Sequence, residues 1–520
     1  MNKFLQKFAA LNIIKRLSIN QVLLLSVFVL ASCGLAYELI MAALASYLLG
    51  DSILQFSLVI GLYLFSMGIG AQVAKYITDS QLLKSFIEIE LLVGIIGGLS
   101  ALFLFVAFGF AAAPFRSLLF GLVIITGIIV GMEIPLVMRI LNSRKKEFKE
   151  VVSDVLTFDY VGALIVSILF PLFFAPKLGM ARSAILFGIF NVLIAIITAK
   201  IFAQELEKYH SIVRKSYIVL AILVIGFIVA NKIMIKAEAY YFGDPVVYAK
   251  TTPYQRLVVT KYKQDVRLYI NGNLQFSSRD EKRYHEALVF PAMELTKNAR
   301  RVLILGGGDG LAAREVLKYP QLEKIVLVDL DKEMTDLFSS ADFLTKLNQN
   351  SLNNNKLEII NKDAIKYLEV SKDKFDVIIV DFPDPSNFSL GKLYSVPIYR
   401  LMKNHLNKNG KIVMQSTSPY FAPNAFWCVV KTLKEANLKV NPYHIYVPSF
   451  GEWGFILAGE DNELNFADNL QVKADFLSPE IIRNMFNFPP DMQEREVKAN
   501  HLNNQLLVQY FEEDWREILR

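Results

Sequence analysis

Long apolar stretches dominate the first 236 residues of the chain, and short polar segments separate them. Seven stretches, centred near residues 35, 65, 100, 127, 165, 190 and 225, each run for about twenty residues or more. A helix of that length is long enough to cross the hydrocarbon core of a bilayer. The first stretch is too long for a cleavable signal peptide. We therefore expect a multi-pass α-helical membrane domain of about seven transmembrane helices over residues 1–236, with the lipid bilayer as a partner.

From residue 237 onward the apolar runs are shorter and alternate with helix-like stretches. Continuous apolar runs that end in glycine or acidic residues are typical of buried parallel strands, and their alternation with helices favours a doubly wound α/β domain. The pattern predicts a small β-rich substrate or lid domain over residues 237–298. It predicts a Rossmann-like, methyltransferase-type catalytic domain over residues 299–520.

A glycine-rich turn, Gly306-Gly-Gly-Asp-Gly310, follows the first buried strand of this second part. Turns of this kind bind nucleotides, with glycines such as Gly306 and Gly308 allowing the ligand to approach the backbone. The lysine of a phosphate loop is missing, and the carboxylate of Asp309 would repel pyrophosphate. The turn therefore favours a cationic ligand over NAD or ATP.

Two further strands end near carboxylates. The second strand ends at Asp329, about twenty residues past the glycines, where a carboxylate can accept hydrogen bonds from ribose hydroxyls. The third strand is followed by Asp363, which can reach an adenine amino group. Together with the acid in the glycine turn, these residues indicate a site for an adenosyl sulfonium ligand.

Four motifs, in this order along the chain, resemble those of the spermidine synthase (polyamine aminopropyltransferase) family. They are Leu268-Tyr-Ile-Asn-Gly-Asn-Leu-Gln275, Ser277-Ser-Arg-Asp-Glu-Lys-Arg-Tyr-His-Glu286, Gly306-Gly-Gly-Asp-Gly-Leu-Ala-Ala-Arg-Glu-Val-Leu-Lys318 and Asp381-Phe-Pro-Asp-Pro385. The resemblance extends from Gln255 to the end of the chain. It implies transfer of an aminopropyl group from decarboxylated S-adenosylmethionine to a diamine such as putrescine, giving spermidine and methylthioadenosine. The donor is a co-substrate and not a prosthetic group.

The resemblance also assigns individual residues. The positions that match the family's adenosyl-binding residues are Gln255, Asp329, Asp363 and Ala364. The positions that match or resemble its amine-binding residues are Tyr284, His285, Asp309, Asp384 and Tyr446. Asp381 falls on its proton acceptor. Family enzymes are commonly dimers or tetramers, so the resemblance implies a homo-oligomer.

The same chemistry can be argued from the residues themselves. A free amine with a pKa of roughly 10 is almost wholly protonated at neutral pH, so a carboxylate beside it must take the proton during attack. Asp381 and Asp384 lie three residues apart in a proline-stiffened turn at the end of a strand, where they can do this. The carboxylate of Asp309 can pair with the aminopropyl ammonium of the donor and repel the extra carboxylate of intact S-adenosylmethionine.

Some positions depart from the family pattern and leave the acceptor amine less defined than the reaction class. Leu311 stands where the family usually has a glycine, Phe290 where a histidine is common, and Phe388 where a proline usually lines the adenine pocket. Asp329 replaces the usual glutamate and would reach a ribose with a shorter side chain.

Structural explanations compete for several other residues. Asp331 follows a strand and precedes a helix, which favours a helix N-cap. Tyr443 and His444 suit packing as well as ligand binding. The two cysteines, Cys33 and Cys428, lie in apolar segments, and the five histidines show no ligand spacing, so we expect neither a disulfide framework nor a metal site.

Two other functions remain open at this point. One is methyl transfer from intact S-adenosylmethionine, which shares the expected fold but does not favour an acid at Asp309. The other is a polyamine transporter or sensor whose second part only binds. Retention of both Asp381 and Asp384 argues against a pure binding protein, since binding alone needs no proton acceptor.

Positive charge is concentrated in the membrane part. Residues 1–236 contain 20 lysines and arginines against 12 acidic residues, and the remainder contains 35 against 37, so nucleic-acid binding is not indicated. The basic residues before the first helix and after the fourth place the amino terminus in the cytoplasm: Lys3, Lys7, Lys15, Arg16, Arg139, Arg144, Lys145, Lys146 and Lys149. Seven crossings would then export the catalytic domain. The donor implied by the resemblance is cytosolic, so either one stretch does not cross or the enzyme works outside on exported substrate. Lys232 and Lys236 after the last stretch favour a cytoplasmic catalytic domain. We therefore expect a protein of the cell membrane with its catalytic domain in the cytoplasm.

Several acids lie inside or beside the apolar stretches. Glu38 and Glu133 lie deep in them, and a cation or polyamine pathway is one interpretation of such acids. The competing interpretation, which we favour, is that the acids of these stretches are interfacial or form helix-packing hydrogen bonds. Glu88, Glu90 and Asp154 lie near segment ends, which favours interfacial positions and helix-packing hydrogen bonds.

Overall fold

The computed structural model describes residues 19–49, 52–110, 114–144 and 147–518. The contacts divide the chain into two compact units, Met1–Pro253 and Tyr254–Arg520. The expected boundary at residue 236 falls inside helix α8 (Tyr209–Phe242). A separate β-rich domain over residues 237–298 stays a prediction. The basic residues Lys3, Lys7, Lys15, Arg16, Lys145 and Lys146 lie outside the described residues.

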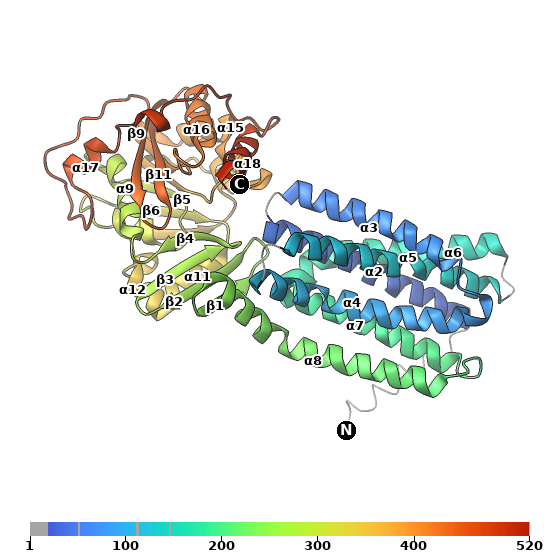
Figure 1. The fold of residues 1–520 in the computed structure, drawn as a ribbon. Coiled ribbons are helices and arrows are strands. Elements are labelled where there is room, and N and C mark those ends of the chain that lie inside the picture. Colours follow the sequence, from blue (N-terminus) through green and yellow to red (C-terminus); the bar gives the residue numbers. More distant parts are fainter. Residues whose placement is uncertain (1–18, 50–51, 111–113, 145–146, 519–520) are drawn as a thin grey trace. The chain divides into compact units, whose positions relative to one another are not determined.

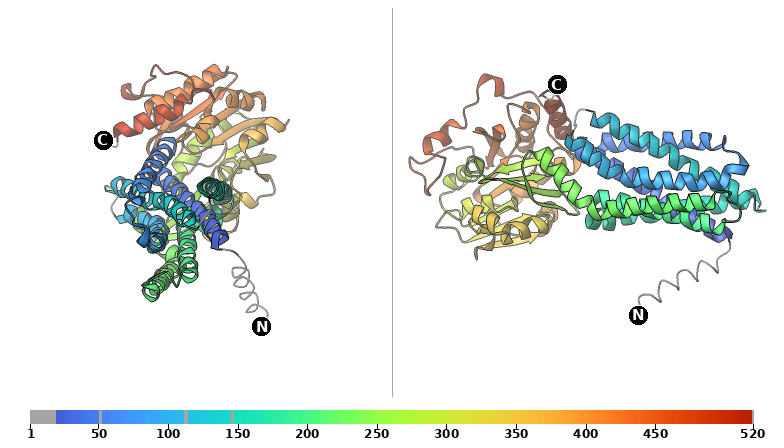
Figure 2. Two further views of the ribbon diagram at one scale, coloured as in Figure 1. Left: turned by 90° about the vertical axis from the view of Figure 1, so that its right-hand side faces the viewer. Right: turned by 60° about the horizontal axis from the view of Figure 1, so that its bottom comes forward.

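The first unit is a bundle of long apolar helices that lie side by side (Figures 1 and 2). Each of the seven apolar stretches of the sequence falls on one helix. They are α2 (Ile19–Leu49), α3 (Ser52–Ala74), α4 (Leu82–Phe110), α5 (Phe115–Asn142), α6 (Phe148–Leu169), α7 (Ala175–Ile201) and α8. By length and hydropathy, 6 helical segments can cross a membrane, because residues 148–201 count as one segment of 54 residues.

This long segment turns back on itself at Gly179. The backbone there has φ 75° and ψ 169°, a conformation essentially restricted to glycine. The ring centroids of Phe174 and Phe187 are 5.0 Å apart, whereas these residues would be about 20 Å apart along one continuous helix. The hydroxyl of Ser183 donates to the carbonyl of Phe174 at 3.1 Å. Helices α6 and α7 are therefore two antiparallel helices.

Glycines allow helices α3 and α5 to approach each other closely. A Cβ atom on Gly70 would lie 2.0 Å from the carbonyl oxygen of Ile128, and one on Gly131 would lie 2.2 Å from that of Met67. Gly70 is therefore a position of close helix packing. Gly61 is not such a position, because a Cβ atom there would meet nothing within 4 Å.

The second unit begins with an antiparallel meander of three strands, which follows β1 (Val246–Thr251) in the chain. The strands are β2 (Arg256–Tyr262), β3 (Asp265–Ile270) and β4 (Asn273–Ser277), with β3 paired to both neighbours. Helix α9 (Glu281–Leu295) then leads into a larger sheet.

The larger sheet has seven strands in the order β10-β11-β9-β8-β5-β6-β7. They are β5 (Arg301–Gly306), β6 (Lys324–Asp329), β7 (Leu357–Asn361), β8 (Phe375–Asp381), β9 (Leu406–Gln415), β10 (Lys439–Val447) and β11 (Gly451–Gly459). Strands β5 to β9 run parallel, and β11 is antiparallel to both β9 and β10. The chain order reverses between β5 and β8, so ligands are expected at the carboxyl ends of these two strands.

Helices accompany the strands of this sheet. They are α10 (Leu311–Val316), α11 (Lys332–Ser340), α12 (Asp342–Leu347), α13 (Ala364–Val370), α14 (Phe388–Gly391), α15 (Val396–Asn404), α16 (Pro423–Glu435), α17 (Pro479–Asn484) and α18 (Leu506–Ile518). Residues Val302 to Leu305 of β5 are all fully buried, as expected for a central strand that is covered on both faces. The expected Rossmann-like α/β domain is thereby confirmed.

Candidate active site

The glycine turn and Asp381 meet at the carboxyl ends of the two central strands. Gly306, the last residue of β5, lies opposite Asp381, the last residue of β8, in the parallel register. Gly306 has φ 82°, and a Cβ atom there would lie 2.3 Å from the carbonyl oxygen of Asp381. Only glycine permits this approach without moving the strands apart. The backbone of the turn therefore fixes the position of the acid.

Asp381 is held by a tyrosine from helix α9. The hydroxyl of Tyr284 donates a hydrogen bond of 2.6 Å to Oδ1 of Asp381. Burial and the charge of Asp381 raise the pKa of Tyr284, so the phenol stays protonated and acts as the donor. Burial raises the pKa of Asp381, while the positive charge of His285 and the hydrogen bond from Tyr284 lower it. These opposing effects suit a base that must be ionised before it accepts a proton.

His285 is oriented by an acid one helical turn before it. Its Nδ1 atom lies 2.9 Å from Oε2 of Glu281 and 2.9 Å from the Glu281 carbonyl oxygen, so Nδ1 carries a proton toward Glu281. Burial lowers the pKa of His285, but the hydrogen bond and charge of Glu281 raise it by more, and the net shift is upward. The imidazole is therefore biased toward its charged form, between the carboxylates of Asp309 and Asp381.

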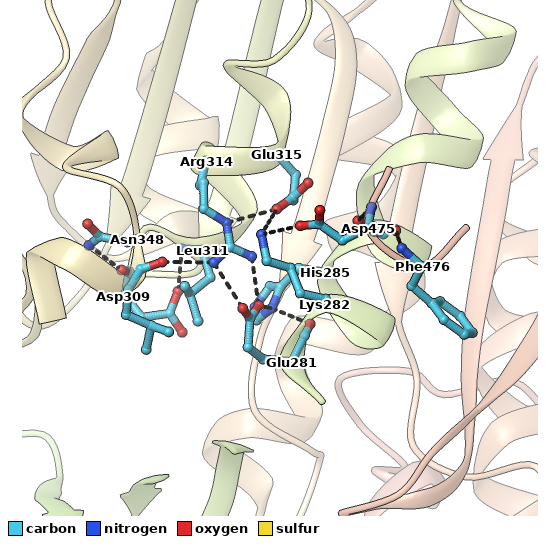
Figure 3. A network of polar contacts seen from close by, with 12 residues as sticks. Glu281, Lys282, His285, Asp309, Leu311, Arg314, Glu315, Asn348, Asp475 and Phe476 are labelled. Carbon is cyan, nitrogen blue, oxygen red and sulfur yellow. Dashed lines mark hydrogen bonds and ion pairs between the residues drawn. The ribbon is translucent and has the colours of Figure 1, made fainter. Parts of the chain in front are cut away.

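Glu281 in turn belongs to a buried ionic network, which Figure 3 shows around Arg314. The guanidinium of Arg314 donates to both carboxylate oxygens of Glu281, at 2.9 and 2.7 Å, and to Glu315 at 2.8 Å. Lys282 contacts Glu315 at 3.2 Å. Burial would raise the pKa of Glu281, but His285 and Arg314 lower it from its usual 4.5 to about 2. The network keeps Glu281 ionised as the partner of His285.

Asp309 lies in the glycine turn with a defined orientation. Its Oδ1 atom accepts the backbone N–H of Leu311 at 2.9 Å, and its carbonyl accepts the side-chain amide of Asn348 at 2.9 Å. Burial raises the pKa of Asp309 from 3.8 to about 6, although the charge of His285 opposes this. His285 is therefore the cationic neighbour of both Asp309 and Asp381.

Asp384 follows in the Asp381-Phe-Pro-Asp-Pro385 turn. The side-chain amide of Gln415 approaches Oδ1 of Asp384 at 3.4 Å and also bonds to the carbonyl of Phe382. The hydroxyl of Tyr394 donates to the carbonyl of Pro383 at 2.9 Å, which holds the turn in place. Burial raises the pKa of Asp384 from 3.8 to about 7, with the Gln415 hydrogen bond opposing it.

The residues expected to bind the donor lie at the ends of β6 and β7. Asp329 accepts the N–H of Gly308 at 3.0 Å and that of Asp331 at 2.8 Å, one on each carboxylate oxygen. Each oxygen retains capacity for another hydrogen bond. Burial raises the pKa of Asp329 from 3.8 to about 6. Gln255 donates to Asp331 at 3.0 Å, so these residues form one polar group.

Asp331 and Asp363 both cap helices. Asp331 is the N-cap of α11, and its side chain accepts the N–H of Glu333 at 3.1 Å, which confirms the expected N-cap. Asp363 is the N-cap of α13, with its Oδ1 atom accepting the N–H of Ile365 at 2.9 Å. Ala364 begins that helix and is 9% exposed. The adenosyl contacts of Asp363 and Ala364 stay predictions.

Aromatic residues of strands β10 and β11 lie near the site or pack beneath it. The ring centroid of Phe455 lies 5.3 Å from that of Tyr284, so strand β11 supports the tyrosine that holds the acid. Tyr443 donates to the carbonyl of Ala287 at 2.8 Å and is fully buried, which is a packing position. His444 is bonded to Glu452 at 2.9 Å. Tyr446 is 51% exposed, and its predicted amine contact is not tested by any of these interactions.

Sequence reasoning missed three residues that organise the site. Glu281 and Arg314 lie within the quoted motifs, but their pairing joins positions 33 residues apart. Gln415 lies at the end of β9 and contacts the turn from the next strand. The sequence does contain a signal for Gln415, because this polar residue ends an apolar strand. The same signal identified Asp329.

Comparison with known proteins shows which family the chain belongs to. The model of the spermine/spermidine synthase domain matches residues 281–469. Polyamine aminopropyltransferase 2 of Ralstonia nicotianae is 55% identical over 506 residues, covering 96% of this chain and 99% of that protein. The chain belongs to the polyamine aminopropyltransferase family.

The chain is also similar to a second bacterial relative and to a solved structure. The polyamine aminopropyltransferase of Leptospira interrogans is 46% identical and covers 96% of this chain and 99% of its own. A solved spermidine synthase in complex with the transition state analogue AdoDATO aligns over 47% of this chain and 85% of its own, with 24% identity and a TM-score of 0.44. The matches to the bacterial relatives include the helical unit, so the resemblance seen in the motifs extends to both parts of the chain.

Proposed function

We propose that the chain transfers the aminopropyl group of decarboxylated S-adenosylmethionine to a diamine such as putrescine, with Asp381 as the proton acceptor. Membership of the family supports the reaction. The observation that supports the role of Asp381 is its 2.6 Å hydrogen bond to Tyr284 at the end of β8, beside the glycine turn. Spermidine and methylthioadenosine are the products.

The reaction needs little beyond alignment and deprotonation. The lone pair of the amine attacks the aminopropyl carbon next to sulfur, the carbon–sulfur bond breaks, and its electrons convert the sulfonium to a neutral thioether. The proton released by the amine passes to Asp381. Because the sulfonium is already a good leaving group, holding the amine in line with the carbon–sulfur bond supplies most of the remaining catalysis.

The charges of the site match two cationic substrates. Asp309, Asp381 and Asp384 supply three carboxylates, and His285 offsets part of their repulsion. Asp309 would pair with the ammonium of the donor and disfavour a donor that retains its carboxylate. Asp384 would pair with the far ammonium of the diamine. Asp329 and Asp363 would bind the adenosyl group.

The decisive experiment compares donors and amines on the purified full-length protein. Decarboxylated and intact S-adenosylmethionine are each incubated with putrescine, cadaverine, spermidine and agmatine, and the products are identified by mass spectrometry. We expect spermidine and methylthioadenosine from the decarboxylated donor. A methylated amine from the intact donor, or binding of the donor without turnover of any amine, would favour methyl transfer or a binding-only role instead.

We also propose that the helical unit crosses the cell membrane and that the catalytic unit lies on the cytoplasmic side, where its donor is made. The length and hydropathy of the 6 helical segments support the crossing. A single cysteine introduced at the exposed Lys408 in intact cells should resist a membrane-impermeant maleimide and react after lysis. Labelling before lysis would place the catalytic unit outside.

A further inference from the structure

Two carboxylates lie inside the helical unit. Glu90 of α4 and Glu133 of α5 are 0% and 3% exposed. Of the two expectations for Glu90, an interfacial position and a helix-packing hydrogen bond, the structure confirms the hydrogen bond, which Asn191 of α7 donates at 3.0 Å. Glu88, two residues earlier, is the one that faces outward, where it pairs with Lys215 at 3.4 Å.

A short chain of hydrogen bonds positions Glu90. The hydroxyl of Tyr37 on α2 donates to Oδ1 of Asn191 on α7 at 3.1 Å. The side-chain nitrogen of Asn191 donates to Oε2 of Glu90 at 3.0 Å. Tyr37 and Asn191 are both fully buried. Three helices therefore hold one oxygen of the Glu90 carboxylate in a fixed place, which leaves the other available to a ligand.

Two carboxylate oxygens of this pair have no hydrogen-bond partner among the residues that the structure describes. Oε1 of Glu90 and Oε1 of Glu133 are buried and accept no hydrogen bond, and the two carboxylates are close enough to interact electrostatically. Thr126, two turns before Glu133 on the same face of α5, also has a buried hydroxyl without a partner. Across the described segments of the chain, neither carboxylate forms an ion pair with lysine or arginine. Acids in this situation are unfavourable unless a cation or a proton accompanies them.

We propose that Glu90 and Glu133 form a second amine site that binds the alkylammonium group of a diamine or polyamine within the helical unit. Among the residues that the structure describes, no group of three or more metal-ligating side chains could hold a metal ion, whereas an ammonium needs only a few acceptors. Tyr37 and Tyr63, both near Glu133, add aromatic surface that favours an organic cation. The choice of amine rests on the proposed function, since amines are the substrate and product of the second unit.

The test counts amine sites in the full-length protein. Binding of radiolabelled putrescine is measured by equilibrium dialysis on the wild type and on Glu90→Gln, Glu133→Gln and Glu88→Gln in detergent micelles without donor. Aminopropyl transfer is assayed on the same preparations. Glu88→Gln is the matched control, because it removes a carboxylate from the same helix but from an outward-facing position.

We expect the wild type and Glu88→Gln to bind a second equivalent of putrescine beyond the one in the catalytic unit. Glu90→Gln and Glu133→Gln should lose it, with affinity at that site falling by about tenfold or more, while transfer activity is kept. A single equivalent in the wild type, or equal binding in all four proteins, overturns the second site.

Two further comparisons separate misfolding and failure of the proposed function from failure of the site. If a Gln variant loses both amine binding and transfer, Glu133→Asp and Glu90→Asp are measured in the same way. Each Asp variant retains a carboxylate and should therefore bind the second equivalent of putrescine. A purely structural defect would not be repaired by restoring a carboxylate. Wild-type protein that binds the second equivalent but transfers no aminopropyl group supports the helical site and contradicts only the proposed reaction. Loss of the second equivalent in both Asp variants, with transfer intact, counts against the site.

Discussion

Tyr284 and Asp381 are 97 residues apart in the chain, and their side chains meet through a hydrogen bond of 2.6 Å. The tyrosine lies on the helix that precedes the large sheet, and the acid ends a central strand of that sheet. One contact therefore fixes the direction of the proposed proton acceptor and influences its charge.

Replacing this tyrosine should change the pH dependence of the reaction. The hydrogen bond from Tyr284 lowers the pKa of Asp381, so Tyr284→Phe should raise it. Because the acceptor works only when ionised, activity is lost as the pH falls through this pKa, and the acid limb of the kcat/KM profile should move to higher pH. The measurement is the pH profile of wild type and variant. Superimposable acid limbs would mean that the tyrosine only packs.

Removal of the acceptor itself should have the largest effect on turnover. Asp381→Asn should lower kcat by about a hundredfold or more, because general-base catalysis is lost, and should leave the donor affinity nearly unchanged. Asp373→Asn is a suitable control, since that acid is half-exposed and pairs with Arg301 away from the site. Single-turnover kinetics and calorimetric titration of the donor are the measurements. Turnover near that of the wild type would exclude Asp381 as the base.

The choice between donors should depend on Asp309. Asp309→Asn removes both the partner of the donor ammonium and the charge that repels a carboxylate. Binding of decarboxylated S-adenosylmethionine should weaken and its advantage over the intact form should shrink. Titration of both donors against wild type and variant gives the ratio. If the ratio is unchanged, the carboxylate serves only its 2.9 Å bond to the N–H of Leu311.

The buried pair of Glu281 and Arg314 should contribute to stability in a pH-dependent way. Arg314→Leu removes the guanidinium that bonds to both carboxylate oxygens of Glu281 and should cost about 3–5 kcal/mol at neutral pH. In the wild type, the pKa of Glu281 is depressed from 4.5 to about 2. The stability that this acid contributes is therefore present above pH 4.5 and lost as the pH falls toward 2.

Thermal unfolding of wild type and variant between pH 7 and pH 3 tests this. The difference between the two proteins should be largest at neutral pH and should narrow in acid. Arg300→Leu, which removes an exposed ion pair with Glu323, should cost about 1 kcal/mol or less at all pH values. An Arg314→Leu protein as stable as this control would show that the network contributes little.

Much of the second unit could be predicted because its signals are local. A strand that ends in glycines, and acids placed after apolar runs, identify the edge of a parallel sheet from the sequence alone. The N-cap role of Asp331 follows from its place between a strand and a helix. The pairing of Tyr284 with Asp381 could not be predicted in this way, because it depends on how helix α9 packs against the sheet.

Burial explains what the sequence could not distinguish in the helical unit. Glu88 and Glu90 are two residues apart near the start of an apolar stretch, and hydropathy treats them alike. On a helix they differ by about 200° in direction, so one faces outward to Lys215 while the other faces Asn191 on a neighbouring helix. Only the packing of α4 against α7 separates them.

Among the residues that the structure describes, the turn at Gly179 divides one long apolar segment into two helices, so the helical unit has seven long helices instead of six. A straight helix over residues 148–201 would be about 80 Å long, far more than the roughly 30 Å thickness of a hydrocarbon core, so a helical unit that crosses a membrane, as we propose, needs a reversal within this segment. With the reversal, a chain that crosses with every helix enters at one membrane face and leaves at the other. In a membrane-spanning protein, one glycine would then help to determine whether the catalytic unit meets its amine in the compartment where α2 begins or in the opposite one.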